Sequence, residues 1–373
     1  MHGPRRKGIH GLGALVIGVL PAYESAGTML TSIRIEGFRG LRAFEKDGLG
    51  RVNLLVGRNN AGKTRLLEAI ELLVRPDTIG ALWEQAVRRN EVVRGSPANT
   101  PGPLADVQHL FSGHALSAGK ELRIEGAGES PRKLSVQIRA EPTLRDGGTR
   151  SGRPPGARLQ LACSPGGELE FTWPLMPAGG MMQPAGLPET AQAAVCFVEA
   201  GRWEEARFVA LWEDMVLTAA EKDVLQVVQI VEPRIERIAA AHDGFVIRLF
   251  GESERVPLGA MGDGVERILA LAIQLARAAG GTLLVDEIDT GLHYSVMRPV
   301  WRQLIEAAVR LDVQVFATSH SLDCLQALAG VCEEPGVQSD QVFVHRLEPD
   351  AETATTYSAE DFRVAIEQEM EIR

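Results

Sequence analysis

The spacing of apolar residues near the start of the chain predicts a strand, a loop and a helix in succession. Residues 30–41 set Ile33 and Ile35 between polar neighbours, as in an edge or half-buried strand. Residues 51–56 form a compact apolar run typical of a buried strand, and residues 63–74 carry apolar side chains at helical spacing. We therefore expect a loop between a buried strand and the start of a helix.

The last third of the chain alternates strand-like and helical patterns. We expect these elements in the order 265–279 (helix), 282–285 (strand), 300–310 (helix), 313–318 (strand) and 341–347 (strand). This order predicts an α/β fold, with a parallel sheet and flanking helices. Ser358, followed three residues later by Asp361, has the pattern of a capping box and predicts a final helix through Met370.

The middle of the chain has a different character, because short β-like runs are separated by Gly/Pro-rich stretches at 146–156 and 174–188. We interpret it as an antiparallel β arm with strands at 121–125, 134–139, 157–162 and 168–173. A helical stretch at 204–241 and a strand at 245–250 follow. The chain then divides into an extension (1–28) and one head (29–373) made of a loop lobe (29–75), a β-rich arm (76–193), a helical lobe (194–255) and a C-terminal lobe (256–373).

The first 28 residues imitate a secretory signal, because the basic residues at positions 5–7 precede the largely apolar run 9–20. That run is too short to span a bilayer. Since Met29 directly precedes the first predicted strand, we interpret residues 1–28 as an extension outside the fold. A cleaved signal is the alternative.

Composition limits the class of protein. Of the 373 residues, 45% are hydrophobic and 24% are charged, which is typical of a soluble globular protein. The formal net charge of −10 argues against a surface that is basic throughout, but a local basic groove would still fit, so DNA stays open as a partner. Four widely spaced cysteines without a CxxC pair suit reduced thiols, so we expect a cytoplasmic protein with no membrane association. They are Cys163, Cys196, Cys324 and Cys332.

Residues 57–64 match the pattern G-x-x-x-x-G-K-[ST] between the predicted strand and helix. In such a loop the backbone N–H groups and the helix start hold phosphates. Lys63 would direct a positive charge to the β- and γ-phosphate oxygens, and Thr64 would ligate Mg²⁺. The candidate nucleotide-binding residues are Gly57, Arg58, Asn59, Asn60, Ala61, Gly62, Lys63 and Thr64.

Two adjacent acids end the predicted strand 282–285, as in a Walker B motif. Asp286 would bind Mg²⁺, directly or through water. Glu287 points the other way along the strand and would polarise the attacking water. Adjacent acids are common on protein surfaces, but here they follow a phosphate-binding loop in an α/β pattern.

A glycine-rich segment, residues 261–265, precedes the helix that leads into this strand. The order of phosphate loop, glycine-rich signature, Asp-Glu strand and a strand followed by His320 resembles the ABC-type ATPases of the RecF/SMC/OLD group. The resemblance covers residues 30–75 and 194–373 and is weak between them. It implies a P-loop fold with a mixed sheet, an antiparallel β arm and a helical lobe, in a homodimer whose protomers sandwich two ATP molecules.

The resemblance implies roles for further residues. Each signature would cover the γ-phosphate bound by the other subunit. Because Gly262 and Asp263 replace Ser and Gly of L-S-G-G-Q, we assign this contact to the N–H groups of Gly262 and Gly264. His320 matches the family's switch histidine, which contacts the γ-phosphate, and Asp289 of the D-loop would cross the dimer interface.

Other positions leave alternatives open. Arg267 is either an arginine-finger-like charge or a solvated helix arginine, and we expect His293 to shape the D-loop rather than to catalyse. No Q-loop residue can be chosen among Gln85, Gln108 and Gln137. We expect packing rather than base stacking for Trp203, Trp212 and Trp301.

We therefore expect an ATP-hydrolysing molecular switch that uses ATP and Mg²⁺, with Lys63, Glu287 and His320 as its catalytic residues. No Toprim-type nuclease region follows the head in this sequence, so we expect any nuclease or toxin effector to be a separate protein. Similar standalone ATPases suggest a bacterial defence system by analogy. The alternatives are a RecF-like DNA-repair ATPase, a non-hydrolysing ATP-sensing scaffold, and a P-loop kinase or GTPase, for which no N-K-x-D base reader is visible.

Overall fold

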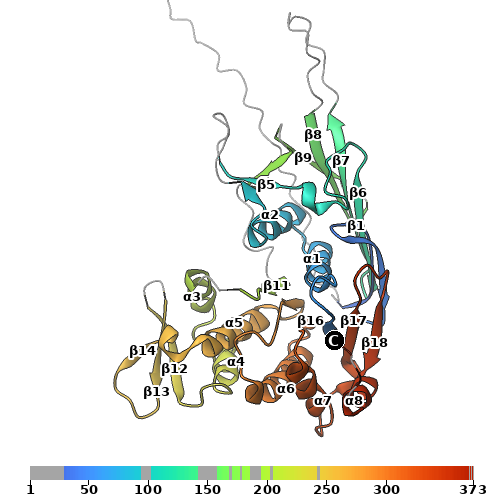
Figure 1. Ribbon diagram of the computed structural model, residues 1–373. Coiled ribbons are helices and arrows are strands. Elements are labelled where there is room, and N and C mark those ends of the chain that lie inside the picture. The colour runs from blue at the N-terminus through green and yellow to red at the C-terminus, as the bar shows by residue number, and fades with distance from the viewer. Residues whose placement is uncertain are drawn as a thin grey trace, which may run out of the picture.

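The computed structural model describes residues 29–93, 102–141, 158–167, 170–176, 179–184, 195–201, 205–241, 244–368, 370 and 372. The extension 1–28, the Gly/Pro-rich stretch 146–156 and Trp203 lie outside these residues. Helix α1 (Lys63–Val74) contacts strands of two six-stranded sheets, and it lies near the centre of Figure 1. Helix α1, which directly follows the candidate phosphate loop, therefore packs against both of these sheets.

A mostly parallel sheet, called the central sheet below, confirms the predicted α/β order. Its strands run β11 (Val195–Val198), β15 (Thr282–Val285), β16 (Gln314–Thr318), β3 (Val52–Val56), β17 (Val342–Leu347) and β18 (Ala354–Ser358). The first five strands are parallel and β18 is antiparallel. The patterns did not predict β11 or β18.

The second six-stranded sheet, called the outer sheet, is antiparallel. Its order is β2 (Leu41–Asp47), β1 (Leu30–Phe38), β6 (Glu121–Gly128), β7 (Arg132–Glu141), β8 (Arg158–Pro165) and β9 (Phe171–Pro174). The strands assigned to the arm thus extend a sheet that begins with β1 and β2. Strand β1 is half-buried as expected, but it is an interior strand rather than an edge strand.

Helix α2 (Thr78–Arg88) was not predicted, because residues 76–193 were interpreted together as a β-rich arm, and its buried residues are in fact largely apolar. Polar and charged side chains add to its contact with α1. Glu71 of α1 is 1% exposed and accepts hydrogen bonds from Arg75, Arg88 and Gln85. Glu68, equally buried, is hydrogen-bonded by Arg89 and ion-paired with Arg39. A small three-stranded sheet lies beyond α2, formed by β4 (Val92–Val93), β5 (Leu104–Asp106) and β10 (Gly180–Met182), with a 3-10 turn at Gln108–Leu110.

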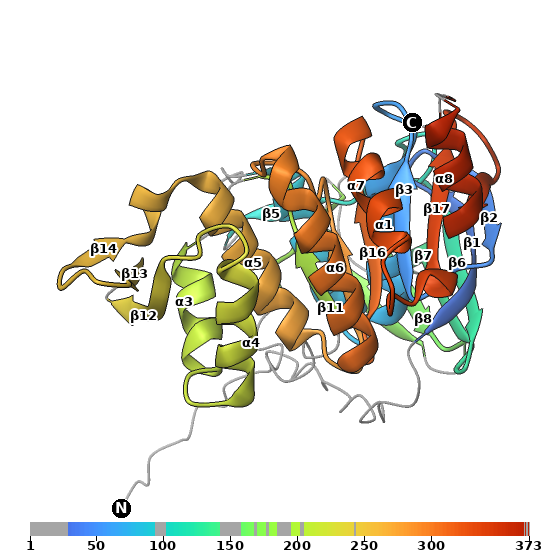
Figure 2. The same ribbon diagram turned by 90° about the horizontal axis from the view of Figure 1, so that it is seen from below.

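The helical lobe contains α3 (Glu205–Glu213), α4 (Ala219–Val228) and a three-stranded sheet of β12 (Ile235–Ala241), β13 (Gly244–Leu249) and β14 (Arg255–Pro257). The expectation of a helix through residue 241 is therefore wrong. A register shift in β12 between Ile235 and Arg237 lets Ile235 and Ile238 both face the core. Their spacing of three imitates a helix. This lobe lies beside α5, on the far side of it from the outer sheet (Figure 2).

The C-terminal lobe follows the predicted order, with shifted boundaries. It contains a 3-10 turn (Leu258–Met261), α5 (Asp263–Arg277), α6 (Tyr294–Arg310), α7 (Leu322–Cys332), a second 3-10 turn (Ser339–Gln341) and α8 (Ala359–Glu367). Helix α6 begins six residues earlier than expected and continues through Pro299. The predicted capping box of Ser358 and Asp361 starts α8, although that helix ends before Met370.

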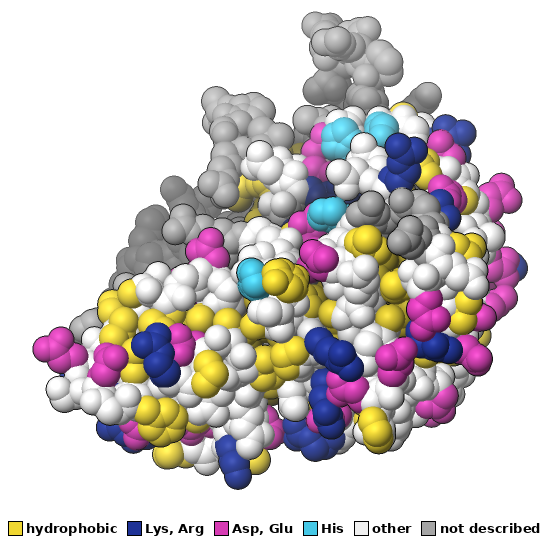
Figure 3. Space-filling view, turned by 60° about the horizontal axis from the view of Figure 1, so that its bottom comes forward, with side chains coloured by type: hydrophobic (Ala, Val, Ile, Leu, Met, Phe, Trp, Pro, Cys, Tyr) yellow, Lys and Arg dark blue, Asp and Glu magenta, His cyan; other side chains and the backbone are white. Residues whose placement is uncertain are grey.

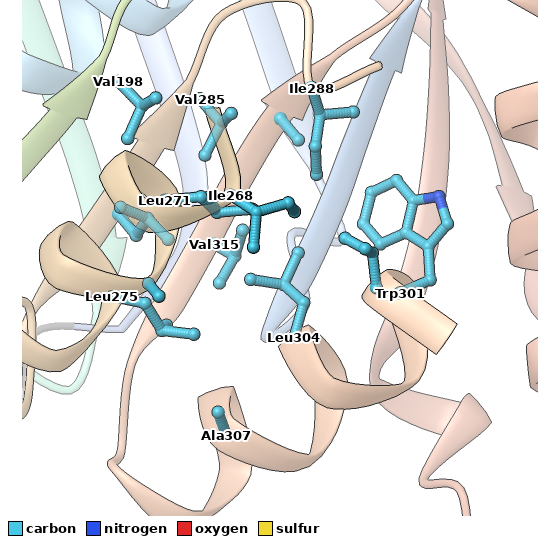
Figure 4. Packing of buried hydrophobic residues seen from close by; sticks show 14 of the residues in the cluster. Val198, Ile268, Leu271, Leu275, Val285, Ile288, Trp301, Leu304, Ala307 and Val315 are labelled. Atoms are coloured by element: carbon cyan, nitrogen blue, oxygen red, sulfur yellow. The ribbon is translucent and has the colours of Figure 1, made fainter. Parts of the chain in front are cut away.

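The central sheet is buried on both faces. In β3, the side chains of Val52, Leu54 and Val56 belong to one apolar cluster, while Leu55 belongs to a second. The first cluster joins α5 and α6 to the sheet, as Ile268, Leu304 and their neighbours show in Figure 4. It also contains Trp212 and Trp301, both 1% exposed or less, which confirms packing for these two tryptophans. Among the described residues, no helix combines the length and apolar character needed to cross a bilayer.

Buried polar side chains also form hydrogen bonds between neighbouring parts of the sheets. The Gln314 amide accepts a 2.8 Å hydrogen bond from Leu30 N and donates to Leu30 O at 2.7 Å and Gly50 O at 2.8 Å. On β17, the His345 ring nitrogens lie 3.0 Å from Thr356 Oγ1 and 3.1 Å from Asn53 Oδ1. Burial lowers the pKa of His345 to about 3, so its ring is neutral in the folded protein near neutral pH.

Candidate functional site

Three neighbouring strands of the central sheet carry the candidate residues at their carboxyl ends. Strands β15, β16 and β3 are adjacent and parallel. Asp286 and Glu287 follow β15, His320 follows β16, and the loop 57–62 follows β3. Since ligands of open α/β sheets bind beyond the carboxyl ends of the strands, the topology directs these groups to one edge.

The loop 57–62 has a backbone that requires glycine at both ends. Gly57 has φ 141°, and a Cβ there would lie 2.3 Å from Leu347 O. Gly62 has φ 99° and precedes α1 with no side-chain cap. The first N–H groups of α1 are therefore left for a ligand at the helix start, where the helix dipole favours an anion.

Lys63 lies over this loop. Its Nζ donates hydrogen bonds to Gly57 O at 2.6 Å and Arg58 O at 3.1 Å. Burial lowers the pKa of Lys63, and the nearby carboxylates of Asp286 and Glu287 partly oppose that effect. The ammonium group is thus held between the phosphate loop and the two acids.

Asp286 and Thr64 form an oxygen-only pair that suits Mg²⁺. The Thr64 hydroxyl lies 3.1 Å from both carboxylate oxygens of Asp286. Magnesium in phosphate-transfer sites takes one or two protein oxygens and leaves its other positions to water and phosphates. The donor set at Thr64 and Asp286 therefore fits Mg²⁺ bound together with a phosphorylated ligand.

Glu287 is held by hydroxyl groups whose role the sequence did not predict. Its amide donates to Thr318 Oγ1 at 2.8 Å, and Thr290 Oγ1 donates to its carboxylate at 3.0 Å. Glu287 has φ 48°, a left-handed conformation that is uncommon for residues other than glycine. Such strain often accompanies function, and here neighbouring hydrogen bonds maintain it.

Arg267 does not fit either alternative left open by the sequence. Its guanidinium donates to the main-chain oxygens of Asp286 at 2.7 Å and Glu287 at 3.0 Å, and also to Glu199 O. Burial lowers its pKa. Arg267 is therefore bound to its own protomer's backbone, rather than free in solvent or extended as a finger.

The glycine-rich segment lies against the D-loop. Gly262 has φ 91° and precedes α5, whose first residue, Asp263, is exposed. A Cβ on Gly264 would lie 3.0 Å from Gly291 O, so the two backbones are in close approach. Within the same loop Asp289 Oδ1 is buried and has no hydrogen-bond partner.

Histidines 293 and 320 differ in their surroundings. His293 Nδ1 lies 2.8 Å from Ser295 Oγ, and the ring caps the start of α6. This position agrees with the expected loop-shaping role. His320 is exposed at the end of β16, directly after the buried Ser319.

The three candidate Q-loop glutamines are held by local partners. Gln85 is fully buried and donates to Glu68 O and Glu71 Oε2. Gln108 donates to Asp106, and Gln137 accepts from Arg139. These hydrogen bonds do not involve the phosphate loop or Asp286, so none of the three is assigned to the site.

A hollow of about 360 Å³ adjoins the phosphate loop, between the β1–β2 turn and the β17–β18 turn. Its polar lining is Arg42, Asn60, Arg65, Glu348, Asp350 and Glu352. Because it contacts the loop at Asn60 and Ala61, it offers room for the rest of a ligand whose phosphates lie at the start of α1.

Comparison with protein families finds matches on both parts of this site. Residues 29–96 match the family described as AAA ATPase domain. Residues 200–323 match the family described as AAA domain, putative AbiEii toxin, Type IV TA system. The first match includes the phosphate loop, and the second includes residues 261–265, both acids and His320.

One relative covers nearly the whole chain at low identity, and another matches a short part of it. A Helicobacter pylori protein named ATP/GTP phosphatase is 22% identical over 91% of this chain and 99% of its own length. An uncharacterized protein of Methanocaldococcus jannaschii is 34% identical over 18% of this chain and 31% of its own.

Among solved structures, the SMC head domain from Thermotoga maritima has a TM-score of 0.44 at 12% identity, covering 89% of this chain and 99% of that one. An Smc head domain bound to the C-terminal domain of ScpA from Pyrococcus furiosus has a TM-score of 0.49 at 12% identity, covering 91% and 98%.

Proposed function

We propose that this chain, an ATPase of the ABC/SMC-like type, hydrolyses Mg²⁺-bound ATP and works as a molecular switch. The observation that carries the proposal is the contact between Thr64 and Asp286. It joins the loop suited to phosphates with the strand that ends in two acids. Matches to AAA ATPase families on both segments support the same chemistry.

Each residue at the edge of the central sheet has a proposed task. Thr64 and Asp286 hold Mg²⁺, which supplies positive charge next to the phosphate oxygens. Lys63 leaves the loop carbonyls and binds the β- and γ-phosphates. Glu287 orients the attacking water and accepts its proton, and His320 contacts the γ-phosphate from the end of β16.

The complete site forms between two copies of the chain. The N–H groups at the start of α5, those of Gly262 and Gly264 among them, suit an anion brought by another molecule, with the carboxylate of the exposed Asp263 turned away from it. The unpartnered Asp289 Oδ1 gains a partner when the D-loop meets its copy. ATP thus closes a homodimer, and hydrolysis reopens it.

The switch acts on a separate effector in a bacterial defence system. One matched family is described as a putative AbiEii toxin of a Type IV TA system, which supports a defence or toxin module. A RecF-like role on DNA ranks second, because basic residues on the outer sheet are paired with acids. The pairs are Arg34–Glu45, Arg123–Glu121, Lys133–Glu125 and Arg139–Glu170. On the face seen in Figure 3, Lys and Arg side chains likewise alternate with Asp and Glu.

The Glu287→Gln variant tests this function. We expect it to bind ATP with wild-type affinity, to lose at least about 100-fold in turnover because general-base catalysis contributes about 10²–10⁴-fold, and to accumulate as an ATP-dependent dimer in size-exclusion chromatography. A Lys63→Met variant should lose ATP binding. Wild-type protein without turnover would indicate a scaffold instead, and turnover stimulated by duplex DNA with a steep salt dependence would favour the RecF-like role.

A further inference from the structure

We propose that Arg267 is a positioning residue that transmits the position of the glycine-rich segment 261–265 to the Glu287 carboxylate. This inference rests on the proposed function, since it concerns the regulation of the same ATP site. Under this proposal, the segment that covers the partner's nucleotide also controls the position of Glu287 in its own protomer.

The hydrogen bonds of Arg267 join two strand ends to one helix. Its Nη2 donates to Asp286 O and Glu287 O, just after β15, and its Nη1 donates to Glu199 O, just after the neighbouring strand β11. A guanidinium offers five N–H donors in one plane, so a single side chain can hold several carbonyls in a fixed arrangement. The carbonyl groups that precede and follow Glu287 along the backbone are thereby tied to α5.

The other end of this connection is the signature itself. Arg267 is the fifth residue of α5, and Gly262 directly precedes that helix. Val265 and Ile268, which flank this turn, are 4% exposed or less. Ile268 packs in one cluster with Val285 and Ile288 of the catalytic strand and loop (Figure 4). Because the first turns of α5 are packed and not mobile on their own, a shift of the helix start displaces the guanidinium with it.

Glu287 is sensitive to such a displacement. Its left-handed φ of 48° is maintained by the hydrogen bond of its amide to Thr318 on one side and by Arg267 at its carbonyl on the other. If Arg267 moves away, the backbone relaxes and the carboxylate no longer points to the attacking water. A general base displaced by about 1 Å can lose about 100-fold in rate. The rate of hydrolysis therefore depends on the position of the signature segment 261–265.

Three variants test the role. In Arg267→Ala the connection is removed, and in Arg267→Lys one ammonium replaces the planar fork. Arg277→Ala is the matched control, since Arg277 lies in the last turn of the same helix and has no hydrogen bond or ion pair within the described part of the chain. ATP turnover, the Kd of a fluorescent ATP analogue and the thermal midpoint are measured for each. Amide hydrogen exchange of residues 285–290 in the nucleotide-free protein is the readout that does not depend on turnover.

We expect Arg267→Ala to lower kcat about 10- to 100-fold, the size expected for lost hydrogen bonds to a charged group, with the Kd for ATP within about twofold of wild type. Exchange at the Ile288 and Thr290 amides, which bond Thr318 O and Glu287 O, should accelerate. Arg267→Lys should be intermediate and Arg277→Ala unchanged.

The inference is overturned if Arg267→Ala matches Arg277→Ala in turnover and exchange, or if both arginine 267 variants lose turnover only in proportion to lost ATP binding. Should Arg267→Ala not fold, Arg267→Lys carries the same comparison. If wild-type protein has no turnover, the proposed function fails, whereas the exchange result still tests the connection between α5 and the catalytic strand.

Discussion

Thr318 donates a 2.7 Å hydrogen bond from its hydroxyl to Asp286 Oδ1. The hydroxyl oxygen of Thr318 also accepts a hydrogen bond from the amide of Glu287, so one fully buried side chain of β16 orients both acids that follow β15. The proposed metal ligand and the proposed base therefore depend on a residue of the neighbouring strand.

The first prediction removes this hydroxyl. Thr318→Val keeps the shape of the side chain but leaves the Glu287 amide without an acceptor, which costs about 1–3 kcal/mol for a buried group. We expect turnover to fall at least about tenfold, by the same energy scale. Thr318→Ser retains the hydroxyl and should retain most activity. Steady-state ATPase assays measure the loss of turnover in both variants, and denaturation curves measure the loss of stability. Equal activity of the Val and Ser variants would contradict the assigned role.

The second prediction concerns the phosphate loop. Gly57→Ala would place a methyl group 2.3 Å from Leu347 O at a φ of 141°, so the loop must change its path. We expect ATP binding to weaken at least about tenfold, because the amide groups no longer converge on the phosphates. Gly201→Ala is the control, since a Cβ there meets no described residue within 4 Å. Isothermal titration with ATP measures both variants; unchanged affinity in Gly57→Ala would show that this loop does not hold the phosphates.

The third prediction tests the buried charges between α1 and α2. Glu71→Ala leaves Arg88 without its carboxylate partner in a largely buried interface, and breaking a buried ion pair costs about 3–5 kcal/mol. Glu306→Ala breaks the exposed pair with Arg302 and should cost no more than about 1 kcal/mol. Urea denaturation gives the free energy of unfolding of both variants. Similar losses in the two would mean that the α1–α2 contact is not stabilised by these charges.

The fourth prediction is a pH dependence of stability. His345 has a pKa of about 3 in the folded protein and an ordinary value of about 6.5 in the unfolded chain. Between these values only the unfolded state binds the proton, so stability is present above about pH 6.5 and is lost as the pH falls toward 3. Between pH 7.5 and 5.5 this amounts to about 1.4 kcal/mol.

His345→Gln removes the titrating ring while keeping polar atoms near Asn53 and Thr356. Urea denaturation at both pH values should therefore show a steeper loss for wild type than for the variant. Parallel losses in the two proteins would mean that the ring titrates normally when folded.

The hydrophobic patterns in the sequence predicted the bounds of an element correctly where the spacing of apolar residues alone determined it. The bounds of α1 and β15 match the structure to the residue, because an apolar strand or an amphipathic helix there meets a strong turn signal. Helix α2 was missed, although its buried residues are largely apolar, because the Gly/Pro-rich stretches and short β-like runs that follow it led us to interpret residues 76–193 together as a β arm. Strand β12 was taken for a helix because of its register shift.

For the candidate site, a motif located Lys63, Thr64 and Asp286, but not the residues that orient them. The tasks of Thr318 and Arg267 depend on which strands become neighbours and on main-chain oxygens distant in sequence. Side-chain type does not reveal such partners. The roles of all the site residues stay predictions for the variants above, those of Lys63, Thr64 and Asp286 as much as those of Glu287, His320 and the signature glycines.

The two-sided strand β3 has a consequence for how the molecule comes apart. Leu55 packs in one apolar cluster and Leu54 in the other. Unfolding of either cluster therefore exposes apolar side chains of β3 that belong to the packing of the whole molecule. The antiparallel and parallel halves are therefore not separable modules. Heating should melt them together in a single calorimetric transition, and a fragment containing one half should aggregate rather than fold.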